Sequence, residues 1–204
     1  MKLDKKGLLV VISGPSGVGK SSVRKALFNM RNHNLAYSIS MTTREKRPQE
    51  VEGQDYYFVS HEEFQQRIKE KKFLEYAQFC GNFYGTPKDK IDEMLNAGKE
   101  VILEIEVEGA QQVMKQVKDA VFIFIVPPTP TAIEERLRNR GTDCLCDIEL
   151  RLNKAKSEYM VAHKYDYIVV NDEIYNAADR ILAIIRAEHA KSKRTIDEYL
   201  NLLK

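Results

Sequence analysis

At residues 14–21 the chain reads Gly-Pro-Ser-Gly-Val-Gly-Lys-Ser, directly after the apolar run Leu8–Ile12 and at the start of a helix-like segment. This order of strand, loop and helix is the context that the phosphate-binding pattern G-x-x-x-x-G-K-S/T requires. Glycine lets successive backbone N–H groups turn inward around a phosphate at the N-terminus of a helix. We expect Lys20 to reach the β- and γ-phosphates of a nucleoside triphosphate, and the Ser21 hydroxyl to ligate Mg²⁺. The alternative for the same residues is an ordinary glycine-rich turn.

The composition limits the class of protein. The chain has 204 residues, 43% of them hydrophobic, and 32 Lys and Arg against 30 Asp and Glu give a formal net charge of +2. A domain of this size can bury a substantial core, and the charge balance excludes a surface that is basic throughout. No stretch approaches the ~20 apolar residues of a membrane span, and Leu8–Ile12 is too short for a signal peptide. We therefore expect a cytoplasmic protein without a nucleic-acid or membrane partner.

The cysteines and histidines do not form a recognisable metal or disulfide pattern. Three cysteines, Cys80, Cys144 and Cys146, are an odd number, which favours free thiols in a reducing compartment. The four histidines lie far apart in the sequence, so we do not expect a structural zinc site.

Short apolar runs alternate with helix-like segments along most of the chain. The expected strands are Leu8–Ile12, Val101–Ile105, Val121–Val126 and Tyr167–Val170. The expected helices run from Lys20 to Met30, Lys88 to Ala97, Gly109 to Val117, Thr131 to Arg138, Glu149 to His163 and Ile174 to Lys191, with a terminal helix over 194–204. This alternation predicts an α/β fold with a central parallel sheet flanked by helices.

Two segments depart from this alternation of strands and helices, and they predict an inserted lobe and a separate loop. The first contains short aromatic strand candidates and suggests an inserted small mixed α/β lobe; its strands are Tyr37–Ser40, Asp55–Val59, Phe73–Phe79 and Asn82–Tyr84. Ser60 and Glu63 resemble a capping box that starts a helix within this lobe. The second segment, 139–147, is polar and breaks two helical patterns, as loops that close over phosphates often do.

The lobe opens with a candidate phosphate clamp. Arg44 and Arg47 lie three residues apart in a hydroxyl-rich stretch that starts at Ser38. The planar guanidinium donates two hydrogen bonds at once and stays charged, so two such groups can hold one phosphate. The pair alone is equally compatible with a solvated basic turn.

Taken together, the motifs resemble those of guanylate kinases. The resemblance spans residues 7 to 190 and rests on an ordered set of pieces: 12–21, 40–44 with Arg47-Pro48, 50–59, 73–77, 81–86, 136–142, Arg151 and 169–172. It implies a P-loop kinase fold in a single domain, with a core of about 1–37, 88–138 and 152–204, a GMP-binding lobe of about 38–87 and an ATP lid of about 139–151. It also implies transfer of phosphate from ATP to GMP, and to dGMP, with Mg²⁺ as cofactor.

The resemblance implies roles for residues on the acceptor side. Guanine presents N1–H and an exocyclic amine side by side, and the carboxylate of Glu75 would accept both hydrogen bonds. Ser40 and Thr86 would donate to guanine O6, and Glu50 would orient the arginines. For the tyrosines, packing within the lobe is the competing explanation. The residues implied to bind GMP are Ser40, Arg44, Arg47, Glu50, Tyr56, Glu75, Tyr84, Thr86 and Glu104.

On the donor side the resemblance adds the lid to the phosphate loop. Arg136 is otherwise interpreted as an exposed salt-bridging residue, and Asn171, an adenine-side contact by resemblance, as a turn former. The implied ATP-binding residues are Gly14, Pro15, Ser16, Gly17, Val18, Gly19, Lys20, Ser21, Ser22, Arg136, Arg140 and Asn171. The implied catalytic residues are Lys20, Arg44, Arg136, Arg140 and Arg151.

This chain departs from the family pattern at two places. Glu104 and Glu106 stand where the family often carries aspartates, so Glu104 has two open roles, toward guanine or toward the water shell of Mg²⁺. Cys144 and Cys146 lie in the lid, where polar or acidic residues are usual, and tolerated variation or redox control could explain them.

Two rival functions follow from the same residues. A scaffold module with this fold would bind peptides and lack a competent ATP site, which the intact loop and lid arginines disfavour. A GTPase-like switch would carry an Asn-Lys-x-Asp motif, which the sequence lacks, while another nucleoside monophosphate kinase would differ in its acceptor.

Overall fold

The computed structural model describes residues 6–129, 131–139 and 145–201. Within these residues a five-stranded parallel sheet forms the core, in the order β2-β7-β1-β8-β9. The bounds are β1 Leu9–Ser13, β2 Leu35–Tyr37, β7 Glu100–Glu104, β8 Val121–Val126 and β9 Tyr167–Val170. The central strand β1 is buried at every position, which explains its continuous apolar sequence.

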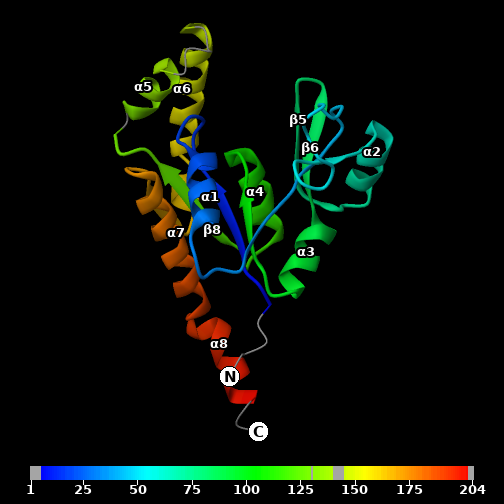
Figure 1. Ribbon diagram of the computed structural model, residues 1–204, viewed down its shortest axis with the longest axis vertical. Coiled ribbons are helices and arrows are strands. Elements are labelled where there is room, and N and C mark those ends of the chain that lie inside the picture. The colour runs from blue at the N-terminus through cyan, green and yellow to red at the C-terminus, as the bar shows by residue number, and fades with distance from the viewer. Residues whose placement is uncertain (1–5, 130, 140–144, 202–204) are drawn as a thin grey trace.

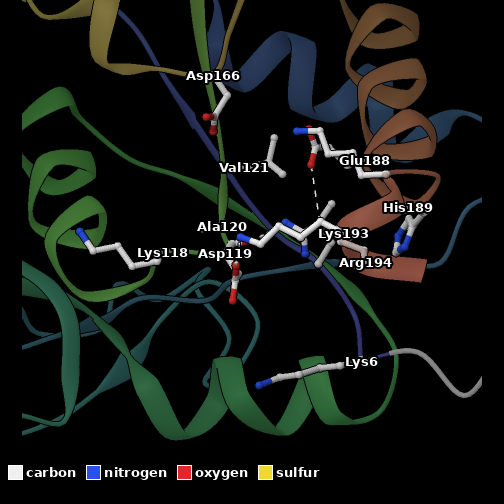
Figure 2. A pocket seen from close by; sticks show the side chains of 12 residues that line it. Lys6, Lys118, Asp119, Ala120, Val121, Asp166, Glu188, His189, Lys193 and Arg194 are labelled. Atoms are coloured by element: carbon white, nitrogen blue, oxygen red, sulfur yellow. Dashed lines mark hydrogen bonds and ion pairs between the residues drawn. The ribbon is translucent and has the colours of Figure 1, made fainter. Parts of the chain in front are cut away.

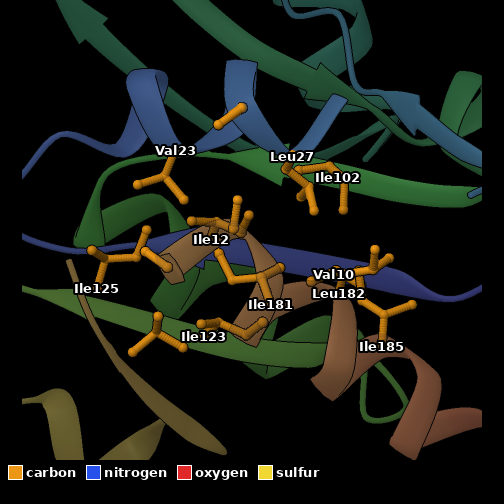
Figure 3. Close-up of a cluster of buried hydrophobic side chains, with 14 of the residues drawn as sticks. Val10, Ile12, Val23, Leu27, Ile102, Ile123, Ile125, Ile181, Leu182 and Ile185 are labelled. Carbon is orange, nitrogen blue, oxygen red and sulfur yellow. The ribbon is translucent and has the colours of Figure 1, made fainter. Parts of the chain in front are cut away.

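Helices cover both faces of this sheet (Figure 1). On one face, α1 (Lys20–Asn29) and α7 (Ile174–His189) pack their apolar side chains against alternate residues of β1 such as Val10 and Ile12 (Figure 3). On the other face, α3 (Lys88–Asn96) and α4 (Val107–Gln116) pack against Leu9 and Val11. The two-residue period of a strand thus divides β1 between two hydrophobic clusters and fixes the phosphate loop that follows it.

The inserted lobe has its own small sheet, in the order β4-β3-β6-β5. The bounds are β3 Met41–Thr42, β4 Tyr57–Phe58, β5 Phe73–Phe79 and β6 Asn82–Pro87. Helix α2 (His61–Lys69) begins as predicted, because the Ser60 hydroxyl accepts the Glu63 N–H at 3.1 Å. The α2 residue Phe64 is fully buried and stacks on Phe73, with ring centroids 4.4 Å apart, so the lobe has a core of its own.

The remaining helices follow β8 and α7. Helices α5 (Ala132–Asn139) and α6 (Leu145–Tyr159) lie together at one end of the molecule in Figure 1, and a short 3-10 helix η1 (Ala162–Lys164) precedes β9. Helix α8 (Ser192–Asn201) follows α7. No helix in the described part of the chain is both long enough and apolar enough to cross a membrane.

The predicted α/β architecture is confirmed, and most boundaries agree within two residues. The prediction that Tyr37–Ser40 is a strand of the lobe was wrong. Tyr37 ends β2 of the core sheet, where it pairs with Ile102, and the first lobe strand starts at Met41. The polar segment 139–147 was also assigned too broadly, since Asn139 ends α5 and α6 runs from Leu145 to Tyr159 instead of from Glu149 to His163.

Candidate active site

A cavity of about 430 Å³ lies where the carboxyl end of β7, the first turn of α4 and the lobe meet. Ligands of α/β proteins commonly bind beyond the carboxyl ends of the strands. Its lining includes six of the predicted site residues: Lys20, Ser40, Tyr56, Glu75, Tyr84 and Glu104. These come from widely separated parts of the sequence, so the fold brings Lys20 of the phosphate loop and several predicted GMP-side residues to one cavity.

The phosphate loop has backbone conformations and close contacts that require glycine. A Cβ at Gly14 would lie 2.4 Å from the carbonyl oxygen of Ile125 in β8, so the loop can leave the sheet this closely only without a side chain. Gly19 is left-handed, with φ 97° and ψ 23°, and immediately precedes α1. The positive end of the α1 dipole therefore faces the loop.

Lys20 lies across the loop and is mostly shielded from solvent. Its Nζ donates to the carbonyl oxygen of Gly14 at 2.6 Å and pairs with Glu106 Oε1 at 3.2 Å. Lys154 of α6 approaches the other carboxylate oxygen of Glu106 at 3.6 Å. Two ammonium groups thus share one carboxylate in a place where triphosphate oxygens could replace it.

Asn171 follows β9, and its side chain contacts the backbone of the phosphate loop. It is 2% exposed, and its Nδ2 donates to the carbonyl oxygen of Val18 at 2.7 Å. The side chain therefore holds the loop through its backbone, and its predicted contact with adenine stays a prediction.

Arg24 and Glu104 form a pair that sequence reasoning missed. Arg24 Nε donates to Glu104 Oε2 at 2.7 Å, and the guanidinium lies 4.2 Å from the ring centroid of Tyr37. The side chains of Arg24 and Glu104 are 22% and 14% exposed, so the pair is partly withdrawn from water. Arg24 thus holds the carboxylate whose role the sequence left open. The two residues are 80 positions apart, and no local signal joins them.

The predicted phosphate clamp is organised around Glu50. Its Oε1 accepts from Arg44 Nη2 at 2.6 Å, and its Oε2 accepts from the backbone N–H of Arg47 at 2.9 Å. These hydrogen bonds hold the pKa of Glu50 below its usual value. Arg44 also lies 5.5 Å from the ring centroid of Tyr56, and Tyr84 packs edge-on against that ring. The side chain of Arg47 is exposed and is not fixed by this contact.

Glu75 is the buried carboxylate of the lobe. It is 7% exposed, and burial raises the pKa of its carboxyl group. Thr86 Oγ1, fully buried on the neighbouring strand, donates to Glu75 Oε1 at 2.6 Å. A hydroxyl has one proton to donate, so in this arrangement Thr86 orients Glu75 instead of facing guanine O6. Ser40, the other hydroxyl predicted to donate to guanine O6, lines the same cavity.

The remaining predicted residues either do not line the cavity or lie outside the described part of the chain. Ser21 and Ser22 are exposed in the first turn of α1, and Arg151 is partly buried on α6. Arg136 belongs to α5, but its side chain is outside the described residues, as is that of Cys146. Arg140 and Cys144 lie in the segment that is not described.

The oxygen donors near the loop fit a Mg²⁺ ion that is held mainly by its substrate. Among the described residues, no group of three or more His, Cys, Asp or Glu could hold a metal ion alone. Ser21 offers a hydroxyl next to Lys20, and Glu104 a carboxylate in the cavity. Mg²⁺ typically binds one or two protein oxygens together with phosphates and water, so this sparse donor set suits it.

A second cavity, of about 410 Å³, lies at the opposite end of the sheet near Val121, the first residue of β8 (Figure 2). Several of its basic side chains already have acidic or carbonyl partners. Lys191 pairs with Glu188 at 2.5 Å, and Arg194 donates to the carbonyl oxygen of Asp119 at 2.7 Å. This cavity is remote from the phosphate loop and is not a candidate for the same chemistry.

Comparisons with known proteins agree on one family. The family model described as guanylate kinase matches residues 6–188. A guanylate kinase of Onion yellows phytoplasma (strain OY-M) is 59% identical over 204 residues, covering 100% of this chain and 96% of the relative. One of Streptococcus thermophilus (strain CNRZ 1066) is 49% identical over 201 residues, covering 98% and 96%. The crystal structure of guanylate kinase from Anaplasma phagocytophilum superposes with a TM-score of 0.71 at 35% identity, covering 93% of this chain and 90% of that one.

Proposed function

Because this chain belongs to the guanylate kinase family, we propose that it transfers the γ-phosphoryl group of ATP to GMP and releases ADP and GDP. The observation that carries the proposal is the shared cavity, which joins Lys20 of the phosphate loop to Glu75 of the lobe. A triphosphate on the loop and a monophosphate in the lobe would face each other across it. The same pocket would take dGMP, since the proposed contacts reach the base and the phosphate but not the 2′-hydroxyl.

Guanine recognition rests on Glu75. An ionised carboxylate accepts both N1–H and the exocyclic amine, whereas adenine has no N1–H to donate. Thr86 holds one carboxylate oxygen, and Ser40 is the proposed donor to guanine O6. Buried polar groups that would be left unpaired by the wrong base give this kind of site its selectivity.

Acceptor binding also needs the GMP phosphate. Arg44, held by Glu50, and the nearby hydroxyls of Tyr56 and Tyr84 are the proposed ligands, together with Arg47 from its exposed position. The acceptor needs no general base, because a phosphate monoester has a second pKa near ~6 and is largely dianionic at pH 7. Catalysis then requires alignment and neutralisation of charge.

On the donor side, the loop backbone and Lys20 would bind the β- and γ-phosphates, with Lys20 leaving Glu106 to do so. Ser21 is the proposed protein ligand of Mg²⁺, with Glu104 toward the water shell of the ion, and the bound ion would neutralise phosphate charge. The lid arginines Arg136, Arg140 and Arg151 are proposed to approach the transferring group, and such arginines can contribute about 10³–10⁵ in rate. Closure of lobe and lid would exclude water that otherwise hydrolyses ATP.

The division into core, lobe and lid at 38–87 and 139–151 is part of this proposal, since each part would bind a different portion of the substrates. A cytoplasmic location and the absence of a nucleic-acid partner stay predictions.

The test is release of ADP from ATP by the purified chain, with and without GMP, in a coupled assay. Turnover that depends on GMP and yields GDP supports the proposal. A folded protein that binds GMP but never releases ADP would contradict it and would favour the scaffold alternative.

A further inference from the structure

Strand β5 carries Glu75 and lies at the edge of the lobe sheet. Among the described strands it pairs with β6, and its other edge lies along α4 of the core. An edge strand presents backbone N–H and C=O groups that need partners. Here two glutamine side chains of a helix supply them.

The contacts form a clamp on the backbone at both sides of Glu75. Gln112 Oε1 accepts the N–H of Tyr76 at 3.1 Å, and Gln112 Nε2 donates to the carbonyl oxygen of the same residue at 3.0 Å. Gln116 Nε2 donates to the carbonyl oxygen of Leu74 at 2.6 Å. Four residues of helix rise about 6 Å and two residues of strand about 6.6 Å, so the two glutamines match alternate strand residues.

Gly109 extends the same contact to the Glu75 side chain. A Cβ at Gly109 would lie only 2.8 Å from Glu75 Oε2, so glycine lets the helix approach the carboxylate. Gly109, Gln112 and Gln116 have the spacing i, i+3 and i+7, which places them on one stripe of α4. This stripe therefore meets both the backbone and the side chain at the base-reading position.

We infer that Gln112, assisted by Gln116, is a positioning residue for guanine recognition. The hydrogen bonds of the two glutamines to the backbone of Leu74 and Tyr76 set where the Glu75 carboxylate lies relative to the core and the phosphate loop. The inference rests on the proposed function, in which Glu75 reads the base. We expect the lobe to fold without the clamp, because it has its own core around Phe64.

The test compares Gln112→Met with Gln111→Met. Methionine keeps the length of the side chain and removes both hydrogen bonds, while Gln111 is a partly buried neighbour on α4 that is not among the described partners of β5. Two lost hydrogen bonds should raise KM for GMP about 10-fold in Gln112→Met, with kcat and KM for ATP near wild type. Gln116→Met, which removes one hydrogen bond, should give a smaller rise and serves if Gln112→Met folds poorly.

Hydrogen exchange at the Tyr76 amide reports the clamp without any substrate. It should be faster in Gln112→Met than in wild type and unchanged in Gln111→Met. An unchanged Tyr76 exchange rate would overturn the clamp, and faster exchange with an unchanged KM for GMP would overturn its positioning role. Failure of the wild-type protein to phosphorylate GMP is a separate result, and it would refute the proposed function while leaving the exchange measurement intact.

Discussion

Substitution of Glu75 by glutamine should separate GMP recognition from folding. The carboxylate is 7% exposed, accepts from Thr86 at 2.6 Å and lies against Gly109. Glutamine has nearly the same shape, so the pocket is preserved. It can accept one hydrogen bond from guanine, but its NH₂ group would face the second guanine donor.

The size of the effect follows from the lost contact. A hydrogen bond to a charged group contributes about 1.5–3 kcal/mol. Since about 1.4 kcal/mol is a factor of ten, kcat/KM for GMP should fall roughly 10- to 150-fold. AMP offers no N1–H to either side chain, so its slow turnover should change little.

The stability of Glu75→Gln should rise or stay unchanged while its activity with GMP falls. Burial raises the pKa of Glu75 in the folded protein, so the folded state holds the proton to higher pH than the unfolded chain. The contribution to stability is therefore largest below the unfolded pKa and is lost as pH rises through the folded pKa. The neutral amide avoids the cost of burying an ionised carboxylate, so the thermal midpoint at pH 7 should be equal or higher.

The assay measures ADP release with GMP or AMP varied at saturating ATP, alongside thermal unfolding at pH 7. Glu93→Gln is the matched control, because the Glu93 side chain is 71% exposed on α3 and remote from the cavity. Equal losses with GMP and AMP, or a loss of activity explained by a lower thermal midpoint, would refute the base-reading role.

Three further predictions address the donor site, the Arg24 pair and pH. Lys20→Ala should lower kcat at least about 10²-fold, because the loop loses its cation toward the phosphates, with an unchanged thermal midpoint; near-normal turnover would reject the phosphate-loop assignment. Arg24→Met should cost roughly 1–3 kcal/mol in urea unfolding by leaving Glu104 without its partner. The double variant Arg24→Met, Glu104→Gln should lose less free energy of unfolding than the two single variants combined. Losses that add strictly would show that the pair is not coupled. Guanosine lacks a titrating phosphate, and its affinity should fall as the pH is lowered, because the pKa of Glu75 lies above the usual 4.5. The protonated acid accepts fewer hydrogen bonds than the carboxylate. Calorimetry that finds no change in affinity down to pH 4.5 would contradict this.

Local sequence patterns predicted the parts of the fold that are decided locally. The phosphate loop depends on residues within 14 positions, and β1 reads as a strand because both of its faces are buried. Tyr37 was misplaced because its strand is short and half-buried, and its pairing with Ile102 is set by a partner 65 residues away. Pairing of that kind leaves no periodicity to detect.

The site shows the same limit. Motif resemblance selected Glu75 and Glu104, and the structure brings both to one cavity. It did not reveal that Arg24 pairs with Glu104, or that the Thr86 hydroxyl donates its hydrogen bond to Glu75, because these contacts depend on side-chain placement across the fold. The spacing of Gly109, Gln112 and Gln116 was a readable signal for a helix face that meets a strand.

A screen of phosphate acceptors tests the assignment of the two half-sites most directly. The purified chain is given ATP and Mg²⁺ with GMP, dGMP, AMP, UMP or CMP, and ADP release is compared with ATP alone. Turnover with GMP and dGMP should exceed that with the other acceptors by at least about 10²-fold, since only guanine satisfies the buried Glu75. Equal rates with AMP, or ADP release that is independent of any acceptor, would contradict the guanine site around Glu75.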